Sequence, residues 1–301
     1  MGLKTPVLLI IFNRPDTTQQ VFSAISQAQP RQLFVAADGP REDKPGEAQK
    51  CQQTRDIIKQ VNWHCEVRTL FQEKNLGCGL GPATGITWFF ENVEEGIILE
   101  DDCLPCGDFF IFCEGLLDYY RDNEKIMHIS GDNFQYGRKR GNSSYYFSAW
   151  ADCHAWGWAT WRRAWKHFDF YCTSTEHRKT VWDWQWGTSV RNNGGLAIVP
   201  KVNLVANIGL GSDSTHCFIP ARCLNQPTQI LEFPLIHPKT ISRNRAADCY
   251  TYCTRVRGWE KVDIAGIIRW QIADLTRTKT VHSAARGIKN ILLPFRGRSQ
   301  A

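Results

Sequence analysis

Short apolar runs alternate with longer polar segments along the first 130 residues of the chain. The apolar runs have the length of strands and lie at Val7–Phe12, Leu33–Ala37, Cys65–Phe71, Ile97–Leu99 and Ile126–Ile129. The segments between them are compatible with helices at 16–28, 46–61, 80–93 and 108–121. This alternation predicts an α/β fold with a mainly parallel sheet covered by helices on both faces.

The composition of the chain changes near residue 145. Eight of the twelve tryptophans lie in a short stretch, at Trp150, Trp156, Trp158, Trp161, Trp165, Trp182, Trp184 and Trp186. Residues 200–240 are rich in glycine and proline, which predicts loops, and a basic, helix-compatible tail follows them. We therefore expect three parts, at 1–145, 146–240 and 241–301.

Size and composition exclude several classes of protein. The 301 residues are 43% hydrophobic and 22% charged, as in ordinary globular proteins, so a disordered or fibrous chain is excluded. No apolar run approaches the roughly 20 residues that cross a bilayer, and the strand at Val7 leaves no room for a signal peptide. We expect a soluble cytoplasmic protein whose twelve cysteines are reduced thiols, since neither close pair, Cys103/Cys106 or Cys249/Cys253, has a second pair at the spacing of a zinc site.

The net charge of +6 is distributed unevenly. Residues 239–301 carry 13 Lys/Arg against 4 Asp/Glu, a net charge of +9, which leaves −3 for the rest. Such a tail suits nucleic acid or phospholipid headgroups, and we expect the second, as peripheral contact with the inner face of the membrane. Its aliphatic residues have the spacing of amphipathic helices: Ile264, Ile267, Ile268, Ile272, Ile288, Ile291 and Leu292. The alternative is that residues 261–293 pack on the body with their basic face solvated.

Polar and charged residues follow the predicted strands, where an open parallel sheet binds its ligands. They are Asn13-Arg14-Pro15, Asp38-Gly39-Pro40, Glu73-Lys74-Asn75-Leu76-Gly77 and Glu100-Asp101-Asp102. The first of these segments is not GxGxxG, and no GxxxxGK[ST] occurs in the chain. A dinucleotide-binding Rossmann domain and a P-loop NTPase are therefore disfavoured.

Three adjacent acids, Glu100, Asp101 and Asp102, come directly after the apolar run ending at Leu99. Because adjacent carboxylates repel one another, this position favours a cation site over a solvated acidic turn or a helix cap. Mg²⁺ and Mn²⁺ prefer such oxygen ligands and often take only one or two from the protein, the rest coming from substrate phosphates. We expect Mn²⁺ or Mg²⁺ as the cofactor.

The strand ending in Leu99-Glu100-Asp101-Asp102, with a proline and the helix at Asp108-Phe109-Phe110 after it, resembles the metal-binding motif of GT-A type glycosyltransferases. N-acetylglucosaminyltransferase I and its bacterial relatives are the most similar. The resemblance covers about residues 5–220 and extends to Phe12-Asn13-Arg14-Pro15, Ala37-Asp38-Gly39, Asn75-Leu76-Gly77 and Ala155-Trp156-Gly157-Trp158 with Trp161 and Trp165. It implies a GT-A fold with a nucleotide-sugar-binding half at 1–145, a Trp-rich acceptor and catalytic half at 146–240, and a helical tail.

The resemblance implies a metal-dependent, inverting transfer of sugar from a nucleotide-diphosphate donor to a glycan or lipid-linked acceptor, as in surface polysaccharide assembly, with no nucleic-acid partner. Asp102 would be the metal ligand, Asp101 would lie near the ribose and Glu100 near the transferred sugar. The remaining residues assigned to the nucleotide sugar are Asn13, Arg14, Asp38 and Asn75. Without the resemblance, Asp38-Gly39-Pro40 could equally be an ordinary turn.

A transferase of this kind needs a base for the acceptor hydroxyl. Asp183 in Trp182-Asp183-Trp184 is the first candidate, because flanking aromatic rings desolvate a carboxylate and make it more basic. The family's base falls in this segment too, although Asp183 could also be a helix cap. Asp213 is the rival base, and His216 is either an auxiliary metal or phosphate ligand or a structural histidine.

The tryptophans suggest where an acceptor would bind, since aromatic rings stack on sugars. Most of the eight are expected in the core, because tryptophan is highly buried on average. We assign Trp156, Trp158 and Trp184 to the acceptor, the first two because Gly157 permits close backbone approach.

Two other functions compete with glycosyl transfer. A nucleotidyltransferase would need a glycine-rich, lysine-bearing loop after the first strand, which Phe12-Asn13-Arg14-Pro15 does not provide. A non-catalytic carbohydrate-binding or membrane-associated protein of the same fold would use the tryptophans and the basic tail without the acids.

Overall fold

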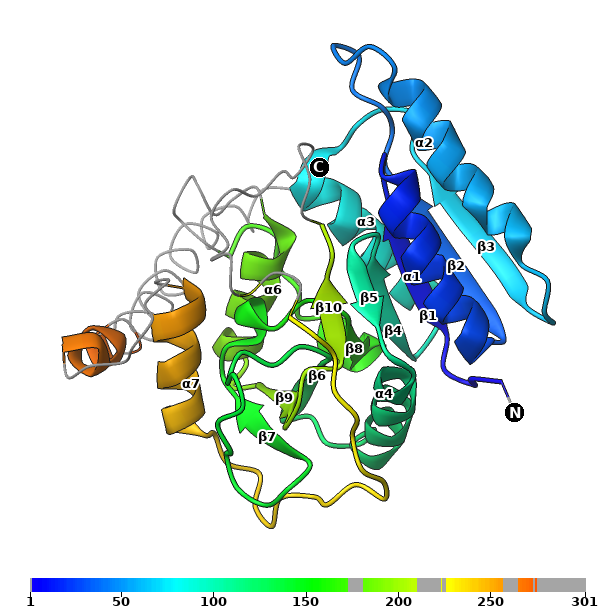
Figure 1. Cartoon of the computed structure of the whole chain (residues 1–301). Coiled ribbons are helices and arrows are strands. Elements are labelled where there is room, and N and C mark those ends of the chain that lie inside the picture. Colours follow the sequence, from blue (N-terminus) through cyan, green and yellow to red (C-terminus); the bar gives the residue numbers. More distant parts are fainter. Residues whose placement is uncertain are drawn as a thin grey trace, which may run out of the picture.

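The computed structural model describes residues 2–172, 181–209, 223, 226–256, 265–272 and 274. A central eight-stranded sheet has the strand order β3-β2-β1-β4-β8-β6-β9-β7, with helices on both faces (Figure 1). Its pairings are parallel for β1 with β2 and β4, β2 with β3, and β6 with β9. The predicted α/β class with a mainly parallel, helix-covered sheet is confirmed.

The first half of the chain follows the predicted alternation closely. Its elements are β1 (Val7–Ile11), α1 (Pro15–Ala28), β2 (Gln32–Ala37), α2 (Glu47–Asp56), the 3-10 helix η1 (Ile57–Gln60), β3 (Glu66–Phe71), α3 (Gly77–Asn92), β4 (Glu95–Glu100), α4 (Gly107–Tyr119) and β6 (Ile126–Ser130). Every predicted strand and helix is present. The largest shift is in α3, which begins at Gly77 rather than at residue 80.

The second half completes the same sheet. β8 (Trp158–Trp161) lies between β4 and β6 and is antiparallel to both, while β9 (Leu196–Pro200) and β7 (Tyr145–Ser148) extend the sheet beyond β6. A separate antiparallel pair joins β5 (Cys103–Pro105) to β10 (Val205–Asn207). The other helices are η2 (Ala151–Cys153), α5 (Arg162–Trp165), α6 (Trp182–Asn192), α7 (Arg245–Thr251) and η5 (Tyr252–Val256), with helical residues 265–272 after them.

Two apolar cores lie on opposite faces of the sheet. On β1, Val7, Leu9 and Ile11 pack in one core with α1 and α4, while Leu8 and Ile10 pack in the other with α3 and α6. All five residues of the strand are buried, because a parallel strand covered on both faces has no solvent side. This explains why β1 is a continuous apolar run in the sequence.

The tryptophan-rich segment is mainly core. Six of the eight tryptophans between Trp150 and Trp186 are buried, and Trp156 and Trp184 are half-buried. Trp158 is 1% exposed and stacks on Trp182, with ring centroids 5.5 Å apart. The prediction that Trp158 borders the acceptor is therefore wrong: it lies on a central strand of the sheet and faces α6.

The cysteines and the tail bear on the expected setting of the protein. None of the ten cysteines whose side chains the structure describes is joined to another in a disulfide. Within the described ranges, no helix combines the length and apolar character needed to cross a bilayer. Helical residues 265–272 are anchored by the buried Trp270, which packs with Trp150, Cys249 and Cys253. Of the predicted amphipathic positions, Ile267, Ile268 and Ile272 are exposed there, and Ile264, Ile288, Ile291 and Leu292 lie outside the described residues.

Candidate functional site

Charged side chains converge at the carboxyl ends of β1 and β4, which are parallel neighbours at the centre of the sheet (Figure 1). Glu100 ends β4, Asp101 and Asp102 follow it, and Arg14 lies just after β1. The Arg14 Nη1 atom is 2.8 Å from Asp102 Oδ2 and 3.6 Å from Asp101 Oδ1. The structure thus brings together four of the residues that the sequence assigned to one site.

The Asp102 carboxylate is also held from β10. Asn207 Nδ2 donates a hydrogen bond of 3.4 Å to Asp102 Oδ1, and the Ile208 backbone N–H donates one of 2.8 Å to the Asp102 carbonyl. A Cβ atom at Gly209 would lie 2.2 Å from Asp102 Oδ2, so only glycine fits there. Sequence analysis missed Asn207 and Gly209, although the family resemblance extended across this segment.

The site concentrates negative charge away from water. Burial, with the neighbouring charge of Asp102, raises the pKa of Asp101 to about 7. Burial and the charges of Asp102, Asp183 and Asp101 raise the pKa of Glu100 well above its usual range. Burial alone would lower the pKa of Arg14, but Asp101 and Asp102 raise it above its usual value. A further cation would stabilise the ionised form of these carboxyl groups.

The raised pKa of Asp101 predicts a pH-dependent stability. Between the usual carboxyl pKa and about 7, the native protein holds a proton that the unfolded chain has released, so the free energy of unfolding falls as pH rises. Asp101→Asn removes this titration and should reduce the fall, by up to about 1.4 kcal/mol per pH unit. Urea denaturation between about pH 5 and about pH 8 measures it, with the exposed Asp118→Asn as control. Parallel pH profiles for wild type and Asp101→Asn would contradict the prediction.

Asp183 reaches the same site from the first turn of α6. Its charge contributes to the raised pKa of Glu100, so the two carboxyl groups lie within electrostatic range of each other. Asp183 Oδ1 also accepts a 2.7 Å hydrogen bond from the Trp184 backbone N–H. The structure therefore places Asp183 near the acids and at a helix start, as both interpretations of the sequence expected.

Asp38 and Asn75 join the ends of two elements. Asp38 Oδ1 accepts hydrogen bonds from the Gly39 and Leu76 backbone N–H groups at 2.9 and 2.8 Å, and Oδ2 accepts one from Gly77 at 3.0 Å. Asn75 Nδ2 donates to the Gly39 carbonyl at 2.8 Å. Burial raises the pKa of Asp38, although these backbone hydrogen bonds oppose the effect. Asp38 thus caps the start of α3 from the end of β2, and its contact with a nucleotide sugar stays a prediction.

Asn13 has a similar structural contact on the other side of the site. Its Nδ2 donates a 2.9 Å hydrogen bond to Oε1 of the buried Glu47, at the start of α2. Arg41 also binds Glu47, through its backbone N–H at 2.7 Å and its side chain. Asn13 therefore holds the loop between β2 and α2 against the end of β1.

The side chains of the site provide only part of the ligands that a hard cation needs. Among the described residues, no three His, Cys, Asp or Glu side chains are arranged to hold a metal ion. The Asp102 carboxylate fits Mn²⁺ or Mg²⁺ as a single oxygen ligand, with the remaining positions left to phosphate and water. The predicted base Asp213 and the predicted ligand His216 lie outside the described residues.

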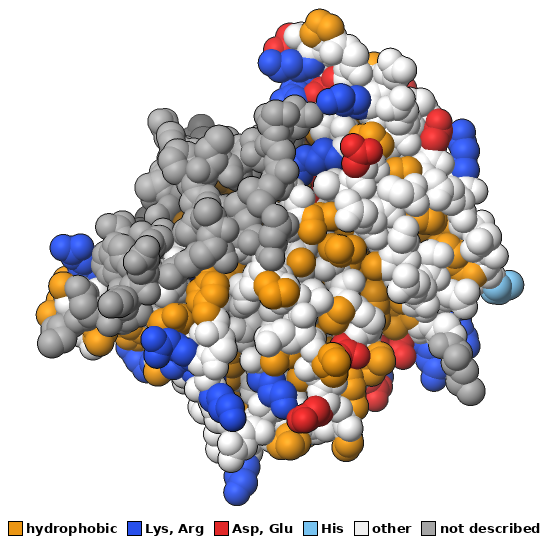
Figure 2. Space-filling model, in the orientation of Figure 1, with side chains coloured by type: hydrophobic (Ala, Val, Ile, Leu, Met, Phe, Trp, Pro, Cys, Tyr) orange, Lys and Arg blue, Asp and Glu red, His pale blue; other side chains and the backbone are white. Residues whose placement is uncertain are grey.

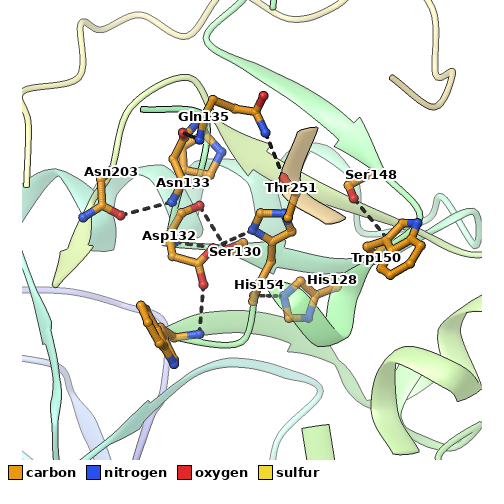
Figure 3. A network of polar contacts seen from close by, with 12 residues as sticks. His128, Ser130, Asp132, Asn133, Gln135, Ser148, Trp150, His154, Asn203 and Thr251 are labelled. Atoms are coloured by element: carbon orange, nitrogen blue, oxygen red, sulfur yellow. Dashed lines mark hydrogen bonds and ion pairs between the residues drawn. The ribbon is translucent and has the colours of Figure 1, made fainter. Parts of the chain in front are cut away.

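A buried polar network lies at the carboxyl end of β6 (Figure 3). Asp132 is fully buried; its Oδ1 is 2.6 Å from His154 Nδ1, and its Oδ2 accepts a 3.1 Å hydrogen bond from the Trp156 backbone N–H. The Asn133 N–H donates to Asn203 Oδ1 at 3.0 Å, just before β10 (Figure 3). The network therefore fixes the loop carrying Trp156 and the segment leading to Asn207. Sequence analysis did not select Asp132, although it follows a predicted strand.

Removing the Asp132 carboxylate should destabilise the fold. Asp132→Ala leaves the buried His154 imidazole and the partly buried Trp156 backbone N–H without their acceptor, and each unsatisfied group costs about 1 to 3 kcal/mol. Chemical denaturation measures the loss, and Asp118→Ala, which removes a 75% exposed carboxylate, is the control. Equal stability of both variants would show that the network is dispensable.

Cys78 is a further residue of the site that sequence analysis missed. Cys78 is exposed and lies in the first turn of α3, directly after the predicted Asn75-Leu76-Gly77 segment. Partial burial and the charges of Asp183, Glu100 and Asp38 raise the pKa of its thiol. These interactions place Cys78 within electrostatic range of Asp183, Glu100 and Asp38.

Alkylation of Cys78 should therefore block the site. Iodoacetamide is expected to react slowly near neutral pH and faster at alkaline pH, because the thiolate is the nucleophile and the pKa is raised. The reaction should abolish the nucleotide-sugar binding that the resemblance implies for the wild type and leave it intact in Cys78→Ser. Peptide mass spectrometry identifies the modified cysteine. Full donor binding by protein alkylated at Cys78 would place the thiol outside the binding site.

No protein-family model matches the chain, and no curated protein is significantly similar to it. The α/β fold is therefore established by the structure itself, and its function has to be argued from the chemistry of the site.

Proposed function

We propose that this chain is a metal-dependent glycosyltransferase of GT-A type, which moves a sugar from a nucleotide-diphosphate donor to a glycan or lipid-linked acceptor. One observation carries the proposal: Glu100, Asp101, Asp102, Arg14 and Asp183 come from three separate segments to one edge of the sheet. Acids paired with a single arginine suit a ligand that brings both phosphate and a cation.

Each of these residues would have a separate role in an inverting transfer. A cation held by Asp102 would neutralise the charge that develops on the leaving diphosphate. Arg14, which contacts Asp102 at 2.8 Å, would bind a phosphate oxygen. The acceptor oxygen attacks the anomeric carbon, the bond from that carbon to the diphosphate oxygen breaks, and Asp183 takes the hydroxyl proton. Asp213 is the second candidate for this base, and His216 for an auxiliary ligand.

The remaining assignments concern recognition and setting. Asp38, Asn75 and Asn13 would shape the nucleotide subsite through the loops that they hold together. Trp156 and Trp184, the two half-buried tryptophans of the segment, would border the acceptor. We place the enzyme in the cytoplasm, on the inner face of the membrane, where lipid-linked acceptors for surface polysaccharides are built.

A donor screen tests the proposal. The purified chain is incubated with Mn²⁺ and uridine, guanosine or cytidine diphosphate sugars, with and without EDTA, and both thermal shift and donor hydrolysis are measured. At least one donor should raise the melting temperature and be hydrolysed only when Mn²⁺ is present. If no donor raises the melting temperature or is hydrolysed under any condition, the proposed glycosyltransferase activity is refuted.

A second arm separates catalysis from glycan binding. The protein with Glu100→Gln, Asp101→Asn and Asp102→Asn is expected to lose donor binding. Nucleotide-independent binding to a glycan array that survives this triple substitution, without donor hydrolysis by the wild type, would favour a carbohydrate-binding protein instead.

A further inference from the structure

An open pocket of about 430 Å³ lies between α7, the turn at 136–141 and helical residues 265–272. Its wall includes Arg138, Arg140, Arg245, Tyr250, Ile267 and Trp270. Of the residues assigned above to sugar transfer, none that the structure describes lines it. The pocket is therefore separate from the acidic edge of the sheet.

Aromatic rings hold the guanidinium groups of this pocket in place. The Arg138 and Arg140 guanidinium carbons lie 4.6 and 5.5 Å from the Tyr250 ring centroid, and Arg245 lies 5.3 Å from a Trp270 ring. Arg140 Nε also donates to Oε1 of the buried Gln135 at 2.5 Å. Guanidinium groups positioned in this way lose little conformational entropy when they bind an anion.

The positive charge of the pocket is only partly compensated. Asp274 forms ion pairs with Arg243 at 2.8 Å and with Arg245 at 3.3 Å, and Asp248 also binds Arg243. Within the described ranges, neither Arg138 nor Arg140 forms an ion pair with a carboxylate. Burial and the nearby charge of Arg138 lower the pKa of Arg140, the direction expected for a cation without an anion beside it.

The rim of the pocket is apolar. Ile267, Trp270 and Gln271 have helical spacing and line the pocket, while Ile268 and Ile272 on the adjacent stripe are 51% and 56% exposed. Hydrophobic and basic side chains lie next to each other at the left edge of the molecule in Figure 2, where helical residues 265–272 lie in Figure 1. A basic pocket with an exposed aliphatic rim fits an amphiphile better than a free sugar or nucleotide.

We propose that this pocket binds an anionic lipid, with the phosphate against Arg138, Arg140 and Arg245 and the aliphatic chains along Ile267 and the exposed isoleucines. Guanidinium groups suit phosphate because their N–H donors match its oxygens. The proposal does not depend on glycosyl transfer. It would hold this side of the molecule against a membrane whatever reaction the acidic site performs.

Calorimetry with soluble ligands tests the pocket on the full chain. Dihexanoyl phosphatidic acid, below its micelle concentration, should bind at least about tenfold more tightly than either dihexanoyl phosphatidylcholine or inorganic phosphate. Arg138→Gln with Arg140→Gln should weaken its binding about tenfold or more, whereas Lys139→Gln should change it by about twofold at most. Lys139 is the matched control, because it is exposed in the same turn and does not line the pocket.

A second pair of variants tests the apolar part. Ile267→Ser should weaken phosphatidic acid binding more than Ile268→Ser, because Ile267 lines the pocket and Ile268 does not. Melting curves verify folding, and Arg138→Gln alone replaces the double variant if that variant is unfolded. If phosphatidic acid and inorganic phosphate bind equally tightly, the ligand is not a lipid. If Lys139→Gln and Arg138→Gln weaken the binding of phosphatidic acid equally, the ligand does not bind in this pocket. Asp102→Asn should leave lipid binding unchanged, so this proposal and the glycosyltransferase can fail separately.

Discussion

Asp102→Asn is expected to weaken Mn²⁺-dependent binding of the nucleotide-sugar donor by about 100-fold or more and to abolish its hydrolysis. Asparagine keeps the size of the side chain and its contact with Asn207, but it removes the charge that would hold the cation. It also removes one of the two ion-pair partners of Arg14, whose Nη1 lies 2.8 Å from Asp102 Oδ2 and 3.6 Å from Asp101 Oδ1. Fluorescence titration with the donor, with and without EDTA, measures the affinity for the donor and the part of that affinity that depends on Mn²⁺.

The control for this variant is Asp118→Asn, which removes an exposed carboxylate on α4 that pairs only locally with Arg121 at 2.9 Å. It should bind donor as the wild type does. If Asp102→Asn binds donor with wild-type, EDTA-sensitive affinity, the cation is held elsewhere and the acidic edge of the sheet is not the donor site. If only EDTA sensitivity disappears and affinity is kept, Arg14 rather than the cation carries the phosphate.

Sequence patterns predicted the parts of the fold that local chemistry determines. β1 and β2 are buried on both faces, so they are continuous apolar runs, and Glu100 and Arg14 could be selected because they follow such runs. β8 could not be placed in this way. Its pairing with β4 and β6 joins segments about 30 to 60 residues apart, and nothing local specifies an antiparallel strand between two parallel ones.

The errors at the site have the same physical origin. Trp158 was assigned to the acceptor from its neighbour Gly157, but burial on a central strand depends on α6, which lies further along the chain. Asn207 ends a strand of three residues, which is too short to give a hydrophobic pattern. Asp132 lies just after β6, a position similar to that of Glu100 at the end of β4. Asp132 is nevertheless fully buried, because the loop that carries Trp156 covers it. A residue just after a strand is predicted to lie near the ligand-binding edge of the sheet. Tertiary packing then determines whether its side chain reaches that edge or is buried.

Asp183→Asn should lower kcat for donor hydrolysis by about 100- to 10,000-fold and leave the donor KM close to that of the wild type. Asparagine keeps an acceptor for the Trp184 N–H at the start of α6, so the helix is retained while the proton acceptor is lost. The structure supports this assignment because the charge of Asp183 raises the pKa of Glu100, which places the carboxylate near the predicted sugar position.

Azide separates the loss of a base from a general distortion of the site. Azide is an anionic nucleophile with no proton to release, so transfer of sugar to azide should stay near the wild-type rate in Asp183→Asn while hydrolysis falls. The same two measurements on Asp213→Asn compare the rival base directly. Loss of both reactions in Asp183→Asn would show that Asp183 positions the donor rather than accepts a proton. Loss of hydrolysis alone in Asp213→Asn, with Asp183→Asn unaffected, would assign the base to Asp213.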